Sequence, residues 1–282
     1  MAKPISIYTL RKFKNEGKKI IALTAYDYST AKYIDEAGID FILVGDSLAM
    51  VALGHKTTLE VTVDEMLVFT KAVARAANRA LVVADMPFMS YHSSTAEAVT
   101  NAGRFLKEGG AKAVKIEGGS KYIVDTVKHC VNVGIPVMGH LGFTPQFLHT
   151  LGGYNVQGKN LETTQKILEQ AQTLEEAGAF AVVLEMVPEE AARVITENLS
   201  IPTIGIGAGR YCSGQILVSD DILGKYSEFT PKFARKYADM AGLIKDAVSR
   251  YGDDVVNGDF PAGGEIFHLT DEERERLEEA LG

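Results

Sequence analysis

The sequence predicts a (β/α)8 barrel, an α/β fold built as a single domain. Short apolar runs alternate with helical segments, a pattern typical of parallel strands that are covered on both faces. Five of these runs end on a polar or ionisable side chain, and the carboxyl ends of barrel strands meet at one catalytic face. The length of 282 residues fits one barrel of about 250 residues with terminal extensions. An open doubly wound sheet is the alternative, but fewer of its strand ends meet at the ligand site.

Capping signals and glycines set the expected elements of the first half. Thr62 with Glu65 and Ser94 with Glu97 form capping boxes at helix starts, and glycines end most helices. The expected order is a helix in 5–16 with Thr9 as a possible N-cap, strand 20–25, a helix from 27 to 37, strand 41–47, a helix from 62 to 78, strand 81–85, a helix from 94 to 108, strand 113–117 and a helix from 120 to 133.

The second half repeats the pattern less regularly. The expected elements are strand 135–140, a long uncharged loop to 158, a helix 162–177, strand 180–185, a helix with Pro188 at its first position, strands 202–206 and 215–219, and a helix 231–250 that closes the barrel. At most one turn of helix fits between the last two strands. We therefore expect an N-terminal helical extension (1–19) that closes the barrel floor, a catalytic barrel (20–250) and a C-terminal tail with a short charged helix (251–282).

Composition narrows the class of protein. A formal net charge of −8 and a pI near 5.4 argue against a broad nucleic-acid or anionic-membrane surface, which needs clustered Lys and Arg. The only cysteines, Cys130 and Cys212, are far apart, as in proteins of a reducing compartment. The first residues lack a secretory signal, and no run of 18 apolar residues occurs. We expect a cytoplasmic enzyme of small molecules that binds neither nucleic acid nor membrane.

Three strand ends suggest a metal site. Asp46, Asp85 and Glu117 offer hard oxygen ligands on neighbouring strands, and that chemistry suits Mg²⁺. Without a cation, three ionised carboxylates in one cleft would raise one another's pKa values. Any one of them alone could instead be a turn residue or a helix cap.

Four further residues are candidates for substrate binding or catalysis. Strand alternation places Lys115 on the same inner face as Glu117, either as its ion-pair partner or as a cation that anchors substrate. Glu185 follows three apolar residues, a setting that tends to raise a carboxyl pKa and favours a general base, although a helix cap is the alternative. His140 is either a hydrogen-bonded interior histidine or a substrate contact. Ser47 could donate to a bound carboxylate or cap the next turn.

A series of phrases resembles one family over most of the chain, from residue 7 to about 250. The phrases are TAYDYS, LVGDSL, DEMLVFTKAV, ADMPFMSY, VKIEGG, GHLGFTPQ, GGYNVQG, LEMVP and IPTIGIGAG. Together they resemble the ketopantoate hydroxymethyltransferase family. The resemblance implies a barrel of the phosphoenolpyruvate/pyruvate superfamily that transfers a hydroxymethyl group from 5,10-methylenetetrahydrofolate to 3-methyl-2-oxobutanoate. The product is 2-dehydropantoate (ketopantoate), on the route to pantothenate and coenzyme A.

The resemblance also implies roles for residues. Asp46 and Asp85 would bind Mg²⁺ and the keto acid, Ser47 and Lys115 would hold the substrate, and Glu117 would support the metal. Glu185 would accept the proton that leaves C3, giving an enolate that Mg²⁺ stabilises. The resemblance also implies a homo-oligomer, since many members of the family form large homo-oligomers, often decamers. Three residues depart from the pattern of the family, in loops rather than in this constellation: Ala49, Glu60 and Ser213.

Other functions are compatible with the same barrel. A metal-dependent lyase or mutase of a related 2-oxo or phosphoenol acid would not need folate. A Schiff-base aldolase using Lys115 would be trapped by borohydride and would tolerate chelators. A barrel retained only as a scaffold would bind neither Mg²⁺ nor keto acid, because a fold alone does not determine function.

Overall fold

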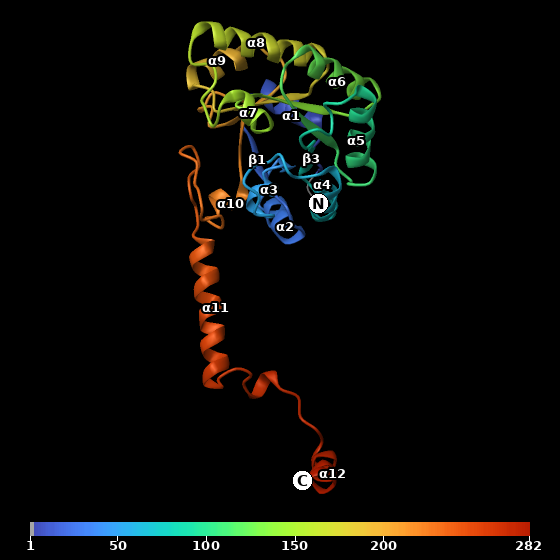
Figure 1. Cartoon of the computed structure of the whole chain (residues 1–282), viewed down its shortest axis with the longest axis vertical. Coiled ribbons are helices and arrows are strands. Elements are labelled where there is room, and N and C mark those ends of the chain that lie inside the picture. Colours follow the sequence, from blue (N-terminus) through green and yellow to red (C-terminus); the bar gives the residue numbers. More distant parts are fainter. Residues whose placement is uncertain (1–2) are drawn as a thin grey trace.

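A closed barrel of parallel strands forms the body of the protein (Figure 1). The computed structural model describes residues 3–282, so residues 1 and 2 of the expected extension lie outside the described residues. Neighbouring strands pair in chain order, and β8 pairs with β1 to close the sheet. The predicted (β/α)8 class is therefore confirmed. The strands are β1 (Ile20–Thr24), β2 (Phe41–Val44), β3 (Leu81–Asp85), β4 (Ala113–Glu117), β5 (Val137–Gly142), β6 (Ala181–Glu185), β7 (Thr203–Ile206) and β8 (Gly214–Leu217).

Helices cover the outside of the barrel between most strands. Their apolar faces pack on the outward side chains of the strands in one continuous core cluster. The helices are α1 (Ile7–Asn15), α2 (Tyr28–Glu36), α3 (Leu48–Val51), α4 (Val63–Ala76), α5 (Thr95–Lys107), α6 (Lys121–Asn132), η1 (Pro145–Phe147), α7 (Leu148–Leu151), α8 (Leu161–Glu176), α9 (Glu189–Glu197), α10 (Ser219–Ile222), α11 (Met240–Asn257), η2 (Gly263–Glu265) and α12 (Asp271–Leu281). The short turns α3, η1 and α7 lie in segments expected to be strand end or loop.

The first helix lies against the amino-terminal end of the barrel interior. Leu10 is fully buried in a cluster with inward side chains of the strands, among them Ile20 and Phe41. The N-cap of α1 is Ser6 and not Thr9, because the Ser6 hydroxyl accepts the Thr9 N–H while Thr9 Oγ1 accepts the Ser6 N–H. This end of the barrel is thus filled by apolar side chains.

The last units depart from the regular pattern. No helix separates β7 from β8, and the first helix after β8 is the one-turn α10. The expectation of a helix from 231 to 250 that closes the barrel is wrong: α11 begins at Met240 and none of its side chains is buried. In Figure 1 it projects away from the barrel, and α12 lies farther out. The expected boundary at residue 250 falls inside α11.

One side of the barrel wall has little cover as a result. Ile21 on β1 and Gln215 on β8 point away from the interior, towards the face that helices cover elsewhere in the barrel. Both are exposed here, Ile21 by 53%. On α11, large apolar side chains at helical spacing are exposed: Ile244, Val248, Tyr251 and Val255. Within residues 3–282, none of the helices combines the length and the apolar character that a membrane span requires.

Candidate active site

A small cavity of about 80 Å³ opens where the carboxyl ends of the strands meet. Inward-facing strand residues and the residues that follow the strands line it. The predicted residues found here are Asp46, Ser47, Asp85, Lys115, Glu117 and His140. Glu185, which ends β6, touches this group through His140. The structure therefore brings together all seven residues that the sequence analysis selected.

Three buried carboxylates form the centre of the site. Each of Asp46, Asp85 and Glu117 offers an oxygen within 4.8 Å of the others, and each residue is at most 4% exposed. Burial, together with the charges of Asp85 and Glu117, raises the pKa of Asp46 well above its ordinary value. A set of hard oxygen ligands in this arrangement fits a divalent cation such as Mg²⁺, which would offset that repulsion.

Lys115 supplies the positive charge among these carboxylates. Its Nζ lies 2.9 Å from Asp85 Oδ1 and 3.2 Å from Glu117 Oε1. Burial lowers the pKa of Lys115, but the charges of Asp85, Glu117 and Asp46 outweigh burial and hold the pKa above its ordinary value. Burial likewise opposes ionisation of Glu117, yet Lys115 and His140 bring its pKa down to about 2. Lys115 is therefore an ammonium group, paired but still lining the cavity.

His140 joins the carboxylate cluster to Glu185. Its Nδ1 donates to Glu117 Oε1 at 3.0 Å, and its Nε2 lies 3.2 Å from Glu185 Oε2. Burial and Lys115 lower the pKa of His140, but the two glutamates reverse this and raise it to about 9. The histidine is thus an interior, hydrogen-bonded residue. Glu185, whose side chain is 15% exposed, contacts this imidazole and not only the apolar surroundings expected.

Ser47 does not cap the helix that follows it. Its Oγ makes no capping hydrogen bond to α3 and lies 2.8 Å from the hydroxyl of Tyr26, a buried residue that follows β1. Burial raises the pKa of Tyr26, so its hydroxyl keeps its proton and can donate to Ser47. This leaves the Ser47 proton free to point into the cavity.

Two residues of the site, Gln146 and Tyr91, were not predicted from the sequence. Gln146 donates from Nε2 to Asp46 Oδ2 at 2.9 Å and from its backbone N–H to Glu117 Oε2 at 3.1 Å. Tyr91 donates to Gln146 Oε1 at 2.6 Å and accepts the backbone N–H of Glu117. Gln146 lies in η1, inside the long uncharged loop, where no periodicity indicates which side chain turns inward. Only the length of the loop indicated that it contributes to function.

The three departures from the family pattern lie outside this cluster. Ala49 is fully buried in α3, Glu60 accepts from Thr57 Oγ1 at 2.6 Å, and Ser213 bonds to Thr203 beside β8. None of them lines the small cavity.

Comparison with known sequences decides the family. A family described as ketopantoate hydroxymethyltransferase matches residues 4–263. The chain belongs to this family. A 3-methyl-2-oxobutanoate hydroxymethyltransferase of Thermoanaerobacter sp. (strain X514) is 55% identical over 97% of this chain and 99% of the relative. One from Clostridium botulinum (strain Alaska E43 / Type E3) is 52% identical over 96% and 98%. The predicted activity in pantothenate biosynthesis is thereby confirmed for this hydroxymethyltransferase.

Solved structures support the barrel type. A phosphonopyruvate hydrolase in complex with oxalate and Mg²⁺ aligns with this hydroxymethyltransferase at a TM-score of 0.61, with 15% identity, over 98% of this chain and 99% of the other. A 2,3-dimethylmalate lyase, described as a member of the PEP mutase/isocitrate lyase superfamily, aligns at 0.58 with 15% identity over 99% and 100%. These likenesses concern the fold alone and agree with the closed barrel.

Proposed function

We propose that the hydroxymethyl donor is 5,10-methylenetetrahydrofolate and that Asp46, Asp85 and Glu117 hold the Mg²⁺ ion required for the transfer. Membership of the ketopantoate hydroxymethyltransferase family supports the donor. The observation that carries the metal site is the group of three buried carboxylates at the mouth of the barrel, with oxygens within 4.8 Å of one another. When bound, the ion supplies positive charge that acidifies the C–H bond beside a ketone and stabilises the enolate.

The chain's own residues bind and orient the keto acid. Lys115, an ammonium group lining the cavity, is suited to the substrate carboxylate, and Ser47 can donate a second hydrogen bond. Gln146 holds Asp46 and Glu117 in place by donating hydrogen bonds of 2.9 and 3.1 Å, and Tyr91 holds Gln146 by donating one of 2.6 Å. The ligand geometry is therefore set before substrate arrives, which is the condition for electrostatic catalysis.

Glu185 is the base in this proposal. Its carboxylate takes the C3 proton of 3-methyl-2-oxobutanoate, and His140, whose Nε2 lies 3.2 Å away, attracts it as an ion-pair partner. The C3 enolate then forms a carbon–carbon bond to the methylene carbon, whose two bonds to the folate nitrogens break. Water supplies the hydroxyl oxygen, and protons end on the nitrogens. Keto acid, methylenetetrahydrofolate and water thus give ketopantoate and tetrahydrofolate.

The test is exchange of the C3 proton in D₂O without folate, followed by NMR. Glu185→Gln should slow the exchange by about 100-fold or more, because an amide cannot accept the proton. Glu190→Gln, an exposed glutamate in the next helix, is the matched control and should exchange at the wild-type rate. Wild-type exchange in Glu185→Gln would remove Glu185 as the base.

The alternatives make different demands on the same residues. A Schiff-base lysine must lose its proton to attack a carbonyl, whereas Asp85 and Glu117 favour the charged form of Lys115. Borohydride should therefore fail to trap keto acid on this enzyme. A lyase or mutase would turn over its acid without folate, so a requirement for methylenetetrahydrofolate separates that alternative.

We also propose a homo-oligomer, a decamer by the family resemblance, in the cytoplasm. The exposed apolar face of α11 and the poorly covered outer face of β1 and β8 support association with further copies of the chain. Both cysteines are free and buried, which supports a reducing compartment. Light scattering coupled to gel filtration tests the assembly, since a monomer at micromolar concentration would contradict it.

A further inference from the structure

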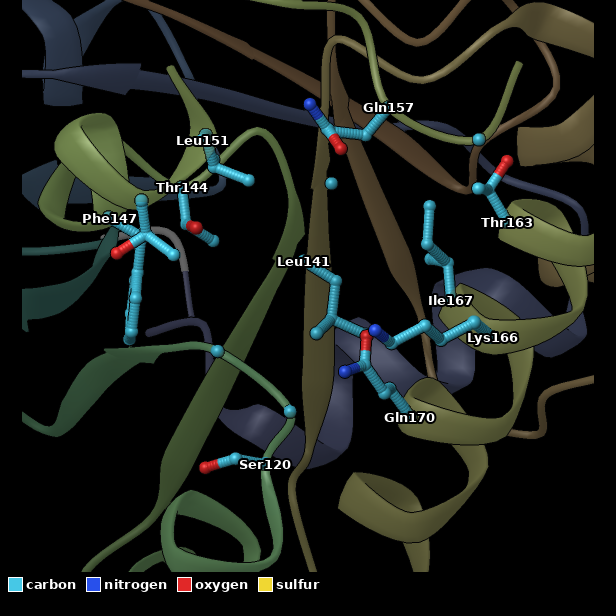
Figure 2. A pocket seen from close by; sticks show the side chains of 15 residues that line it. Ser120, Leu141, Thr144, Phe147, Leu151, Gln157, Thr163, Lys166, Ile167 and Gln170 are labelled. Carbon is cyan, nitrogen blue, oxygen red and sulfur yellow. The ribbon is translucent and has the colours of Figure 1, made fainter. Parts of the chain in front are cut away.

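A second, larger cavity of about 460 Å³ lies beside the active site, outside the barrel wall. It is bounded by the loop between β4 and α6, the end of β5, the segment from η1 to Gly158, and α8. In Figure 2, Lys166 and Gln170 reach into it from α8, opposite Phe147 and Leu151. It shares no lining residue with the small cavity. Its volume is in the range of about 300–1,000 Å³ usual for small-molecule sites.

The two cavities lie on opposite sides of the same two strand ends. Side chains alternate along β4 and β5, so Glu117 and His140 line the small cavity while Gly118 and Leu141 line the large one. Gly142 lines the large cavity and pairs with Glu185 in the sheet. A Cβ atom on Gly142 would lie 2.3 Å from the Glu185 carbonyl oxygen. The large cavity therefore reaches the backbone of the proposed base.

The lining of the large cavity indicates the kind of ligand. Leu141, Phe147, Leu151 and Ile167 form apolar walls, whereas the amides of Gln157 and Gln170 offer hydrogen bonds. No carboxylate lines it, and it contains one cation, Lys166. Among residues 3–282 the side chains of Lys166 and Gln170 have no hydrogen-bond or ion-pair partner. This chemistry suits a heterocycle whose faces pack on apolar walls and whose amide-like edge forms hydrogen bonds, attached to a carboxylate-bearing tail.

We propose that this cavity binds the reduced folate, with the pterin ring between the apolar walls and Lys166 facing the glutamate tail. The inference rests on the proposed function, which requires a second substrate that the 80 Å³ cavity does not accommodate beside the keto acid. The methylene group would approach Glu185 past Gly142, which carries no side chain of its own, and beside Val187, whose Cγ2 lies 2.7 Å from where a Cβ of Gly142 would stand. Keto acid and folate then enter from the two sides of the strand ends.

The first test blocks the cavity with one side chain. Thr150 lines it and is exposed, so Thr150→Trp fills space without disturbing the core. His149→Trp is the matched control, since His149 is exposed and adjacent but does not line the cavity. Calorimetry with tetrahydrofolate on the full chain, with Mg²⁺ and keto acid present, should show Kd raised about tenfold or more in Thr150→Trp and changed less than about twofold in the control.

A second pair tests the cation. Lys166→Met should weaken tetrahydrofolate binding about threefold to tenfold and reduce its salt dependence, because one charge contact is lost. Lys159→Met, an exposed lysine in the preceding loop that does not line the cavity, should bind like the wild type. This pair also decides the question if Thr150→Trp fails to fold by circular dichroism.

Exchange of the keto-acid C3 proton needs no folate, so it distinguishes a failure of the proposed pterin site from a failure of the proposed function. All four variants should exchange at the wild-type rate. Unchanged tetrahydrofolate binding in both Thr150→Trp and Lys166→Met would overturn the pterin site while leaving Glu185 and the metal site intact. Absence of C3 exchange in the wild type would instead refute the proposed function.

Discussion

The two ends of the barrel interior are built from the same eight strands but carry opposite kinds of side chain. At the amino-terminal end, Leu10 of α1 packs with Ile20, Phe41 and other apolar residues. At the carboxyl end, the same strands present Asp85, Glu117 and their neighbours, equally buried but charged. Burying charge costs stability and burying apolar surface contributes it. One end of the barrel therefore stabilises the fold, while the other buries charges at a cost in stability and in an arrangement that is useful for catalysis.

The largest effect on activity is expected from removing a carboxylate at the charged end of the barrel. Asp46→Asn should lower the turnover rate about 1,000-fold or more, since several kcal/mol of transition-state stabilisation depends on the metal. In chelator the variant should be at least as stable as the wild type, because it removes a carboxylate whose pKa burial and the charges of Asp85 and Glu117 raise.

Thermal unfolding with and without Mg²⁺ measures both parts of this prediction. Mg²⁺ should raise the melting temperature of the wild type and not that of Asp46→Asn. Asp125→Asn, an exposed residue of α6, serves as the control and should keep activity and the Mg²⁺ response. A variant that loses much stability in chelator would show that this end also holds the fold together.

The apolar end should respond in the opposite sense. Leu10→Ala removes a fully buried side chain and should lower the free energy of unfolding by about 2–4 kcal/mol, measured in urea. Turnover at saturating substrates should change less than about twofold, since the site lies at the other end of the strands. Val68→Ala, at a position 66% exposed, should cost less than about 0.5 kcal/mol. A large loss of turnover in Leu10→Ala would contradict the assignment of stability to one end and catalysis to the other.

The smallest effect concerns Asp221, a buried carboxylate of α10 at the rim of the charged end. Burial and the charge of Asp220 raise the pKa of Asp221 from 3.8 to about 6. Ionisation of Asp221 therefore lowers the free energy of unfolding progressively as the pH rises from about 4 to 6. Above pH 6 the free energy of unfolding stays lowered by the full amount. Asp221→Asn should stabilise the protein by about 1–2 kcal/mol at pH 7.5.

The stabilisation by Asp221→Asn should depend on pH if it comes from removing a charge. Near pH 4 the difference in stability should vanish, because the wild-type carboxyl is then protonated in the folded chain. Urea unfolding at pH 4, 6 and 7.5 measures it, with the exposed Asp253→Asn as control. A gain that stays constant across this range would point to packing and not to charge.

Much of the charged end could be predicted because strand geometry fixes it. Alternation along a strand places Lys115 on the face of Glu117, and parallel pairing brings strand ends together, so the sequence alone located the cluster. Gln146 could not be found in this way. It reaches Asp46 from a loop whose conformation depends on long-range contacts with Tyr91 and Glu117.

The end of the chain could not be predicted for a different reason. The amphipathic pattern of α11 indicates a helix with one apolar face but not what that face contacts. A helix of this kind after the last strand favours packing on the same barrel, yet its side chains Ile244, Val248 and Tyr251 remain exposed. Local signals fix where a helix begins and ends far better than where it docks.

The missing helix between β7 and β8 has a consequence for how the enzyme behaves on dilution. Because β8 and β1 lack a full covering layer from their own chain, the homo-oligomer proposed above would cover this part of the wall with another copy of the chain. The stability of β8 and β1 would then be linked by mass action to protein concentration. Specific activity should accordingly fall when the enzyme is diluted and return when it is concentrated again.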